Sequence, residues 1–193
     1  MAHPSDQHSS RRRIGLGFAA GTIIAVTLAV PVLAADTVVQ VVNGGARTAS
    51  VANLTLTPLS SSNNAQSNAG SMTLTVDDAS GTGAGWNVTI QTSAFVYSGA
   101  NNGTNIPAAN FSLTAAATPV MTAGQAIDVT NGPKVPASSP VGTLDSARKV
   151  IQANADYGLG TYTQALSVSL SVPAQARAGT YTGTLTTTIS AAP

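Results

Sequence analysis

Apolar and polar residues alternate with a period of two along most of the chain after residue 36. All of the runs except residues 37–42, TVVQVV, place apolar side chains on one face and mainly Ser and Thr on the other. This pattern predicts half-buried β-strands. The runs are residues 37–42, 53–59, 71–76, 86–90, 110–115, 165–172 and 181–190.

Segments rich in Gly, Asn, Ser and Pro separate these runs, as expected for turns and loops. No segment keeps a helical period, and residues 146–155 are expected to form one short helix at most. Seven or more short strands without long helices predict an all-β fold. We expect an antiparallel β-sandwich with an Ig-like two-sheet architecture and a single domain.

The N-terminal segment differs from the rest of the chain. Arg11, Arg12 and Arg13 precede an apolar run, residues 14–34, that ends in small residues. This pattern is typical of a secretory signal peptide, and we expect a signal peptide at residues 1–34 and a mature domain at residues 35–193. A retained membrane anchor is the alternative, because a run of this length nearly spans a bilayer.

Charge and composition exclude several classes of function. Removal of residues 1–34 would leave five basic and six acidic side chains, which predicts a net charge of −1 and no nucleic-acid partner. The sequence has no Cys and no Glu, and both His residues lie in the first ten positions. The mature chain therefore lacks the residues of Ser-His-Asp, Cys-His and zinc sites. We expect no enzyme, no cofactor and no metal site.

Three aspartates are the remaining candidates for site chemistry. Asp77 and Asp78 are neighbours on a predicted strand, so they should point to opposite faces and not share one substrate. Together with Asp128 they could contribute to a calcium site. The simpler interpretation is a strand end and a turn in which aspartate accepts hydrogen bonds from main-chain amides.

Trp86 is the only tryptophan, and it follows a Gly-rich stretch at the start of the run Trp86, Val88, Ile90. In phase with two aliphatic residues, its ring is expected to fill the core between the sheets. An exposed platform for a ligand is the alternative. The core role predicts a buried ring, and the platform role predicts an exposed one.

Two segments of the chain resemble the WxL domain. Residues 181–193, YTGTLTTTISAAP, resemble its proximal motif, Tyr-x-x-x-Leu-Thr-Trp-x-Leu-x-x-x-Pro, with threonine in place of the tryptophan and isoleucine in place of the second leucine. Residues 86–88, WNV, resemble its distal motif, Trp-x-Leu, with valine for leucine. The corresponding residues are Trp86, Val88, Tyr181, Leu185, Thr187, Ile189 and Pro193.

The resemblance implies an exported bacterial protein that is held non-covalently at the cell surface or cell wall. Its expected partner is peptidoglycan or another cell-wall glycan, with other surface proteins as further partners and no membrane contact beyond the leader. The alternative is a structural subunit of a surface layer or fibre. Residues 37–42, TVVQVV, would then be the donor in strand addition.

A glycan binder with few charges would use aromatic stacking and neutral hydrogen bonds. The aromatic candidates for glycan contact are Tyr97, Tyr157 and Tyr162. Packing within the fold is the alternative role for each, because tyrosine is enriched in interfaces without being diagnostic of them. Thr187 bears on wall binding as well. If the family's second tryptophan contacts glycan, its replacement removes part of that contact. If that tryptophan fills the core, threonine leaves a gap unless neighbouring side chains are larger.

Overall fold

The computed structural model describes residues 38–138 and 140–191. The chain divides into two units, residues 1–40 and 41–193, and all the strands belong to the second. The predicted signal peptide and Pro193 lie outside the described residues, so the cleavage site stays a prediction. In the described ranges, no helix has the length and apolar character needed to cross a membrane.

The second unit is all-β, and its paired strands are all antiparallel. This confirms the fold class expected from the alternating pattern. One 3-10 turn, η1, at Ala108–Asn110 is the sole helical element among the described residues. The strands are β1 (Arg47–Val51), β2 (Gln66–Asp78), β3 (Trp86–Thr92), β4 (Val96–Ser98), β5 (Phe111–Ala116), β6 (Val120–Gly124), β7 (Gly142–Thr143), β8 (Arg148–Ala153), β9 (Gly160–Val172), β10 (Thr180–Thr182) and β11 (Leu185–Ala191).

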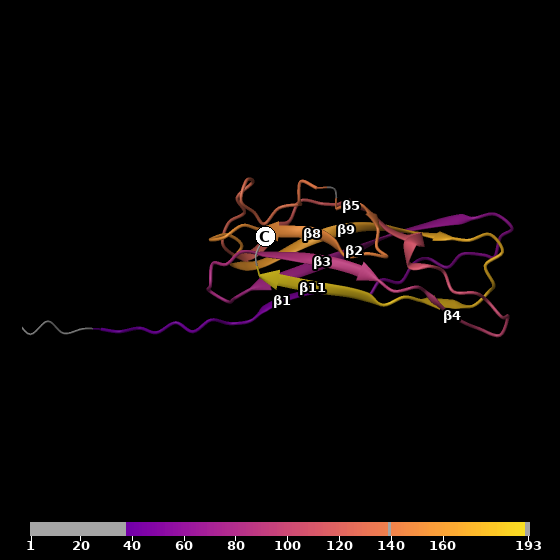
Figure 1. Ribbon diagram of the computed structural model, residues 1–193, viewed down its shortest axis with the longest axis horizontal. Helices are drawn as coiled ribbons and strands as arrows, with labels where there is room; N and C mark the ends of the chain where they lie inside the picture. Colours follow the sequence, from indigo (N-terminus) through magenta and orange to yellow (C-terminus); the bar gives the residue numbers. More distant parts are fainter. Residues whose placement is uncertain (1–37, 139, 192–193) are drawn as a thin grey trace, which may run out of the picture. The chain divides into compact units, whose positions relative to one another are not determined.

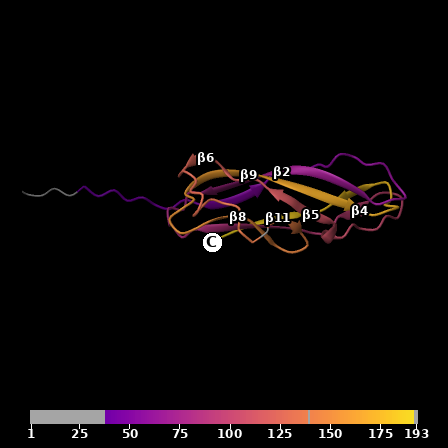
Figure 2. The ribbon, with the colours of Figure 1, turned by 90° about the horizontal axis from the view of Figure 1, so that it is seen from above.

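The strands form two layers. The first is a six-stranded sheet in the order β1-β2-β9-β5-β7, in which β6 also pairs with β9. The second contains the three-stranded sheet β11-β3-β8 and the ribbon β10-β4. Figure 1 shows β4 beyond the ends of β3 and β11. Figure 2 shows β2 and β9 on one side and β8 and β11 on the other. The fold is therefore the expected sandwich.

The core lies between the two layers and follows the predicted alternation. Inward-facing residues of β2, β9 and β5 meet those of β3 and β8, and their side chains are almost completely buried. Outward-facing Ser and Thr cover the outer faces, where they are good strand formers. The largest apolar side chains that are completely buried are Leu74, Trp86, Ile90, Ile106, Leu113, Leu144, Ile151, Tyr162 and Leu166.

The short helix expected within residues 146–155 is wrong, because this segment contains strand β8. Thr89 of β3 is opposite Lys149 and Val88 is opposite Ile151, so Val150 is an extra residue in the ladder. Such a bulge lets two consecutive residues, Val150 and Ile151, both be buried. The bulge breaks the period of two and thus hides the strand from a pattern-based prediction.

Two predicted strands are also absent. The described residues of the run 37–42 lie outside every strand, because the edge strand β1 begins only at Arg47, opposite the last residue of β2, Asp78. The run 53–59 is extended but has no ladder partner. Its Leu54 and Leu56 nevertheless face inward, as the alternation predicts, and pack against the core.

Candidate functional site

The second layer is incomplete over one end of the first. Strands β2 and β9 pair along their whole length, from Asp78 opposite Gly160 to Gln66 opposite Val172. The inward residues of β2 near Asp78 are buried, whereas those near Gln66 are only half-buried. The sheet β11-β3-β8 therefore covers one half of β2 and leaves the other half to different elements.

Two extended segments partly cover this end. Residues 53–62 pass Gly70 of β2, where a Cβ atom would lie 2.7 Å from Leu56 Cδ2, so a larger residue at position 70 would have to displace the Leu56 side chain. The other segment, residues 175–183, leads into and through β10. The two segments are joined at one end, where Gln175 N donates to the Ser62 carbonyl (2.7 Å) and Ser61 Oγ donates to the Ala176 carbonyl (3.0 Å).

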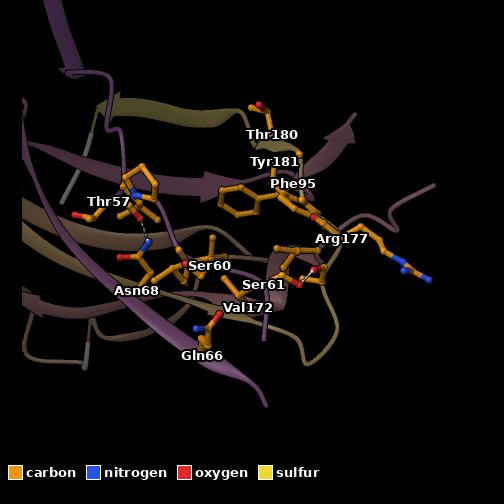
Figure 3. A pocket seen from close by; sticks show the side chains of 18 of the residues that line it. Thr57, Ser60, Ser61, Gln66, Asn68, Phe95, Val172, Arg177, Thr180 and Tyr181 are labelled. Atoms are coloured by element: carbon orange, nitrogen blue, oxygen red, sulfur yellow. Dashed lines mark hydrogen bonds between the residues drawn. The ribbon is translucent and has the colours of Figure 1, made fainter. Parts of the chain in front are cut away.

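Between the two segments lies a cavity of about 730 Å³, which we call the end cavity. Its floor is formed by the half-buried end of β2 and β9, and its walls by the two extended segments. Figure 3 shows side chains from both walls and from the floor around the cavity. The lining residues are 54–62, Gln66, Asn68, Phe95, Ile106, Leu170, Val172 and 176–183.

Aromatic rings form one side of the end cavity. Phe95 is half-buried and packs edge-on against Phe111, with ring centroids 5.4 Å apart. Tyr181 stacks on Tyr97 at 5.3 Å, and its hydroxyl donates to the Arg177 carbonyl. These contacts hold the rings of Phe95 and Tyr181 in fixed positions at the cavity wall. Fixed aromatic faces suit contact with sugar rings or apolar side chains.

The polar part of the lining is mostly uncharged. Gln66 and Asn68 contribute amides from the floor, and Ser and Thr hydroxyls come from both walls. Asn68 Nδ2 donates to the Thr57 carbonyl at 2.7 Å and so ties the wall to the floor (Figure 3). Arg177 is the one charged residue of the lining, and it extends outward at the rim (Figure 3).

A second cavity, of about 470 Å³, continues along the same side of the sandwich. It lies between the open edges of the two layers. Strand β1 and residues 51–56 form one side of it, and residues 182–187 form the other. The two cavities share Leu54, Leu56, Phe95, Thr182 and Gly183. Thr187 lines only the second cavity, which we call the side cavity.

A protein-family profile described as "WxL domain surface cell wall-binding" matches residues 39–193. The chain belongs to the WxL family. This confirms the resemblance found in the sequence and places the protein at the cell surface or cell wall. No curated protein and no solved structure gives a match.

The distal motif of this WxL domain is part of the core. Trp86 and Val88 are 0% exposed, and Trp86 Nε1 donates to the Gly158 carbonyl at 3.0 Å. Trp86 packs against Tyr162, which is opposite Val76 of β2. Val76 and Gln66 are separated by roughly 33 Å of extended strand. The tryptophan therefore lies in the core at one end of the WxL domain, and the end cavity lies at the opposite end.

The proximal motif spans both cavities. Tyr181 lines the end cavity, and Leu185 and Thr187 line the side cavity. Ile189 is opposite Val88 in β3 and packs against the core, so the two motifs of the WxL domain meet in neighbouring strands. Thr187 is half-buried and opposite Ile90, where the family motif has its second tryptophan. The absence of a large ring at this position is consistent with the side cavity.

The three tyrosines predicted as glycan contacts have different environments. Tyr162 is 0% exposed, so its ring offers no surface to a glycan and belongs to the core. Burial raises the pKa of its hydroxyl, which donates to the Gln125 carbonyl at 2.7 Å. Tyr157 packs against the core away from both cavities. Tyr97 supports Tyr181 and is the one member of the set close to the end cavity.

The three aspartates considered for calcium are separated and bound to protein groups. Asp78 is buried and accepts from Arg47 Nη2 at 3.0 Å, whereas Asp77 on the opposite face accepts from Thr161 Oγ1. Asp128 accepts from the amides of Asn131 and Thr130 in a turn, and these hydrogen bonds hold its pKa below the usual value. Within the described ranges, no three His, Cys, Asp or Glu side chains are grouped as metal ligands.

Apart from Tyr181, which belongs to the proximal motif, the residues of the end cavity were missed as site residues by the sequence analysis. Gln66 and Asn68 lie in a segment that reads as a loop, and Arg177 follows a Pro-containing turn. Phe95 carries a signal of its own, since it is one of few aromatic residues in the chain. Nothing local in the sequence indicates that residues 53–62 and 175–183 face each other.

Proposed function

We propose that this protein is retained on the bacterial cell wall by non-covalent binding of peptidoglycan in the end cavity, and that it catalyses no reaction. The observation that carries the proposal is the gap in the second layer over Gln66 and Asn68. Family membership supports attachment to the wall, and the cavity supplies a binding site that the buried Trp86 does not.

The lining, mostly uncharged with one cation at its rim, suits an amide-rich polymer of low charge. Peptidoglycan presents sugar rings, N-acetyl groups and peptide bonds, which can stack on fixed aromatic rings and exchange neutral hydrogen bonds with amides and hydroxyls. Phe95 and Tyr181 supply the rings, and Gln66 supplies a side-chain amide that forms no hydrogen bond with the residues that the structure describes.

Co-sedimentation with purified sacculi tests the proposal. We expect the protein to sediment with sacculi at physiological salt, and Gln66→Ala to weaken the association about three- to tenfold, the range for one neutral hydrogen bond. Gln91→Ala is the matched control, because Gln91 lies on the exposed face of β3 and lines neither cavity. No sedimentation of the wild-type protein would refute wall attachment, and an equal effect of both variants would refute the site.

The second candidate is a structural subunit that assembles by strand addition. It is favoured by the exposed valines at Val38 (95% exposed) and Val42 (87% exposed), and by the open edges of β1 and β11. An added strand would pair with such an edge. Electron microscopy of the concentrated protein distinguishes the two functions, because fibres or ordered layers support assembly and dispersed single particles support wall binding alone.

A further inference from the structure

We infer that the end cavity binds the peptide part of peptidoglycan as an added strand, with a peptide carboxylate at Arg177. This inference rests on the proposed function and names the portion of the wall polymer that the site recognises. Three observations lead to it: the unpaired main chain of one wall, the open edge of the other, and the position of the single charge.

The first wall is an extended segment whose main chain lacks partners. Exposure alternates along residues 53–57 as in a strand, and residues 58–60 are exposed. Residues 53–60 nevertheless pair with no strand and form no main-chain to main-chain hydrogen bond within the part of the chain that the structure describes. Only the Thr57 carbonyl has a partner, Asn68 Nδ2. Except at Pro58, which lacks an N–H, each residue thus offers a donor and an acceptor.

The opposite wall is a strand with one open edge. Strand β10 pairs with β4 on one side only, and β11, which follows it, pairs with β3 on one side only. Their free edges face the same two cavities as residues 51–60. An extended chain placed between the walls would complete the second layer above β2 and β9, as in recognition by strand addition.

The dimensions of the end cavity suit a short peptide. The walls are joined at Ser62 and Gln175, which closes one end, and residues 53–60 offer roughly 25 Å of extended chain. The half-buried floor residues Gln66, Asn68 and Val172 would meet the side chains on one face of the guest. A sugar chain could use the aromatic rings, but it lacks the regular alternation of donors and acceptors that these walls present.

The charge distribution selects an acidic guest. Arg177 is exposed at the rim of the cavity, next to the residues that join the two walls, and forms no ion pair with any residue in the described ranges. Neither cavity has an acidic residue in its lining. A carboxylate on the peptide would therefore find one cation and no competing anion, whereas an uncharged glycan strand would gain only weaker hydrogen bonds to neutral oxygens from Arg177.

Enzymatic removal of the wall peptides tests the inference directly. Sacculi are compared before and after treatment with an amidase that cleaves the peptides from the glycan. We expect binding to fall at least about tenfold after treatment, because most of the strand pairing is lost. Unchanged binding to the stripped glycan overturns the inference and leaves wall attachment standing. No binding to untreated sacculi overturns both.

A charge-matched pair of variants tests the role of Arg177. Arg177→Gln should weaken binding to untreated sacculi about tenfold and reduce its dependence on salt, because a charge-assisted hydrogen bond is lost. Lys149→Gln removes the same charge from β8, outside both cavities, and should leave binding unchanged. Equal binding by the two variants would overturn the assignment of the carboxylate to Arg177.

Amide hydrogen exchange tests the pairing without any variant. On saturation with soluble wall fragments that carry the peptide, the amides of Leu54, Thr55 and Leu56 should exchange at least about tenfold more slowly, because they become hydrogen-bonded. The amides of Ser146 and Ala147, which are exposed in the turn before β8 and line neither cavity, serve as the internal control. Protection by peptide-free glycan of the same length, or none by the peptide fragments, would overturn strand addition.

Discussion

Trp86 and Gly158 are joined by a hydrogen bond of 3.0 Å from the indole Nε1 to the Gly158 carbonyl, 72 residues away in the sequence. The ring is 0% exposed and also packs against Tyr162. This hydrogen bond from the motif tryptophan thus links strand β3 to the loop before β9. Its role in this protein is to hold the two layers together.

This role predicts the effect of Trp86→Ala. The loss of a fully buried ring should lower the free energy of unfolding by roughly 3–5 kcal/mol, as measured by urea denaturation followed by circular dichroism. Wall binding by the fraction that remains folded should be unchanged. Tyr181→Ala is the comparison, because this half-buried ring lines the end cavity and should affect binding more than stability. A fully stable Trp86→Ala protein that no longer binds sacculi would contradict the core role.

Gly158 is the other half of this contact, and its replacement gives a second prediction. Its φ is +83°, and a Cβ atom would lie 2.7 Å from Trp86 Nε1 and 2.6 Å from Ala153 Cβ. Gly158→Ala should therefore lower the unfolding free energy by more than about 2 kcal/mol, from backbone strain and displacement of the ring.

The variant Gly81→Ala distinguishes backbone strain from displacement of the Trp86 ring. Gly81 has a similar φ of +65°, but a Cβ atom there meets nothing within 4 Å. This variant should cost only the strain of the left-handed conformation, about 1 kcal/mol. Both are measured in the same urea titration. Equal losses in the two variants would show that crowding at Trp86 contributes nothing.

The ion pair between Arg47 and Asp78 predicts how stability depends on pH. Burial opposes ionisation of Asp78, but hydrogen bonds from Ser80 and Arg47 outweigh it and hold the pKa of the carboxyl below its ordinary value of 3.8. The unfolded state therefore binds a proton more readily than the folded state. The contribution of Asp78 is complete above the unfolded pKa and is lost as the pH falls through the lower folded pKa.

Asp78→Asn should remove this contribution. We expect its unfolding free energy at pH 7 to be lower by roughly 2–3 kcal/mol, with a smaller further loss on acidification than the wild-type protein shows. The measurement is a series of urea titrations between neutral and acid pH. Asp77→Asn, on the opposite face of β2, is the control and should cost less. Parallel pH profiles for wild type and Asp78→Asn would contradict the assignment.

The sequence predicts the layers well where the pairing is regular. In β2, β3, β9 and β11 each inward residue has a direct partner across the ladder, so local alternation and burial agree. The prediction fails where register or position depends on another strand. Val150 is inserted opposite β3, and β1 begins only at Arg47, so that the described residues of the run 37–42 lie outside every strand. The local period of the sequence shows neither feature.

The candidate site was less predictable than the fold. Trp86 and the proximal motif can be recognised in sequence, but recognition does not distinguish a ring that packs from a ring that binds. The end cavity arises because the second layer is shorter than β2 and β9, and because two remote extended segments diverge above them. Strand lengths in different sheets are set by tertiary pairing, which short-range patterns do not encode.

Thr187 supplies the last prediction, since it lines the side cavity where the family motif has tryptophan. Thr187→Trp should place a large ring in a cavity of about 470 Å³ and raise the free energy of unfolding by about 1 kcal/mol, because apolar area becomes buried without displacement of packed atoms. Thr188→Trp, on the exposed face of the same strand, is the control and should bring no gain. Urea denaturation measures both variants. A marked loss of stability in Thr187→Trp would show that the cavity walls have closed around threonine, so that the space is no longer a site for the missing ring.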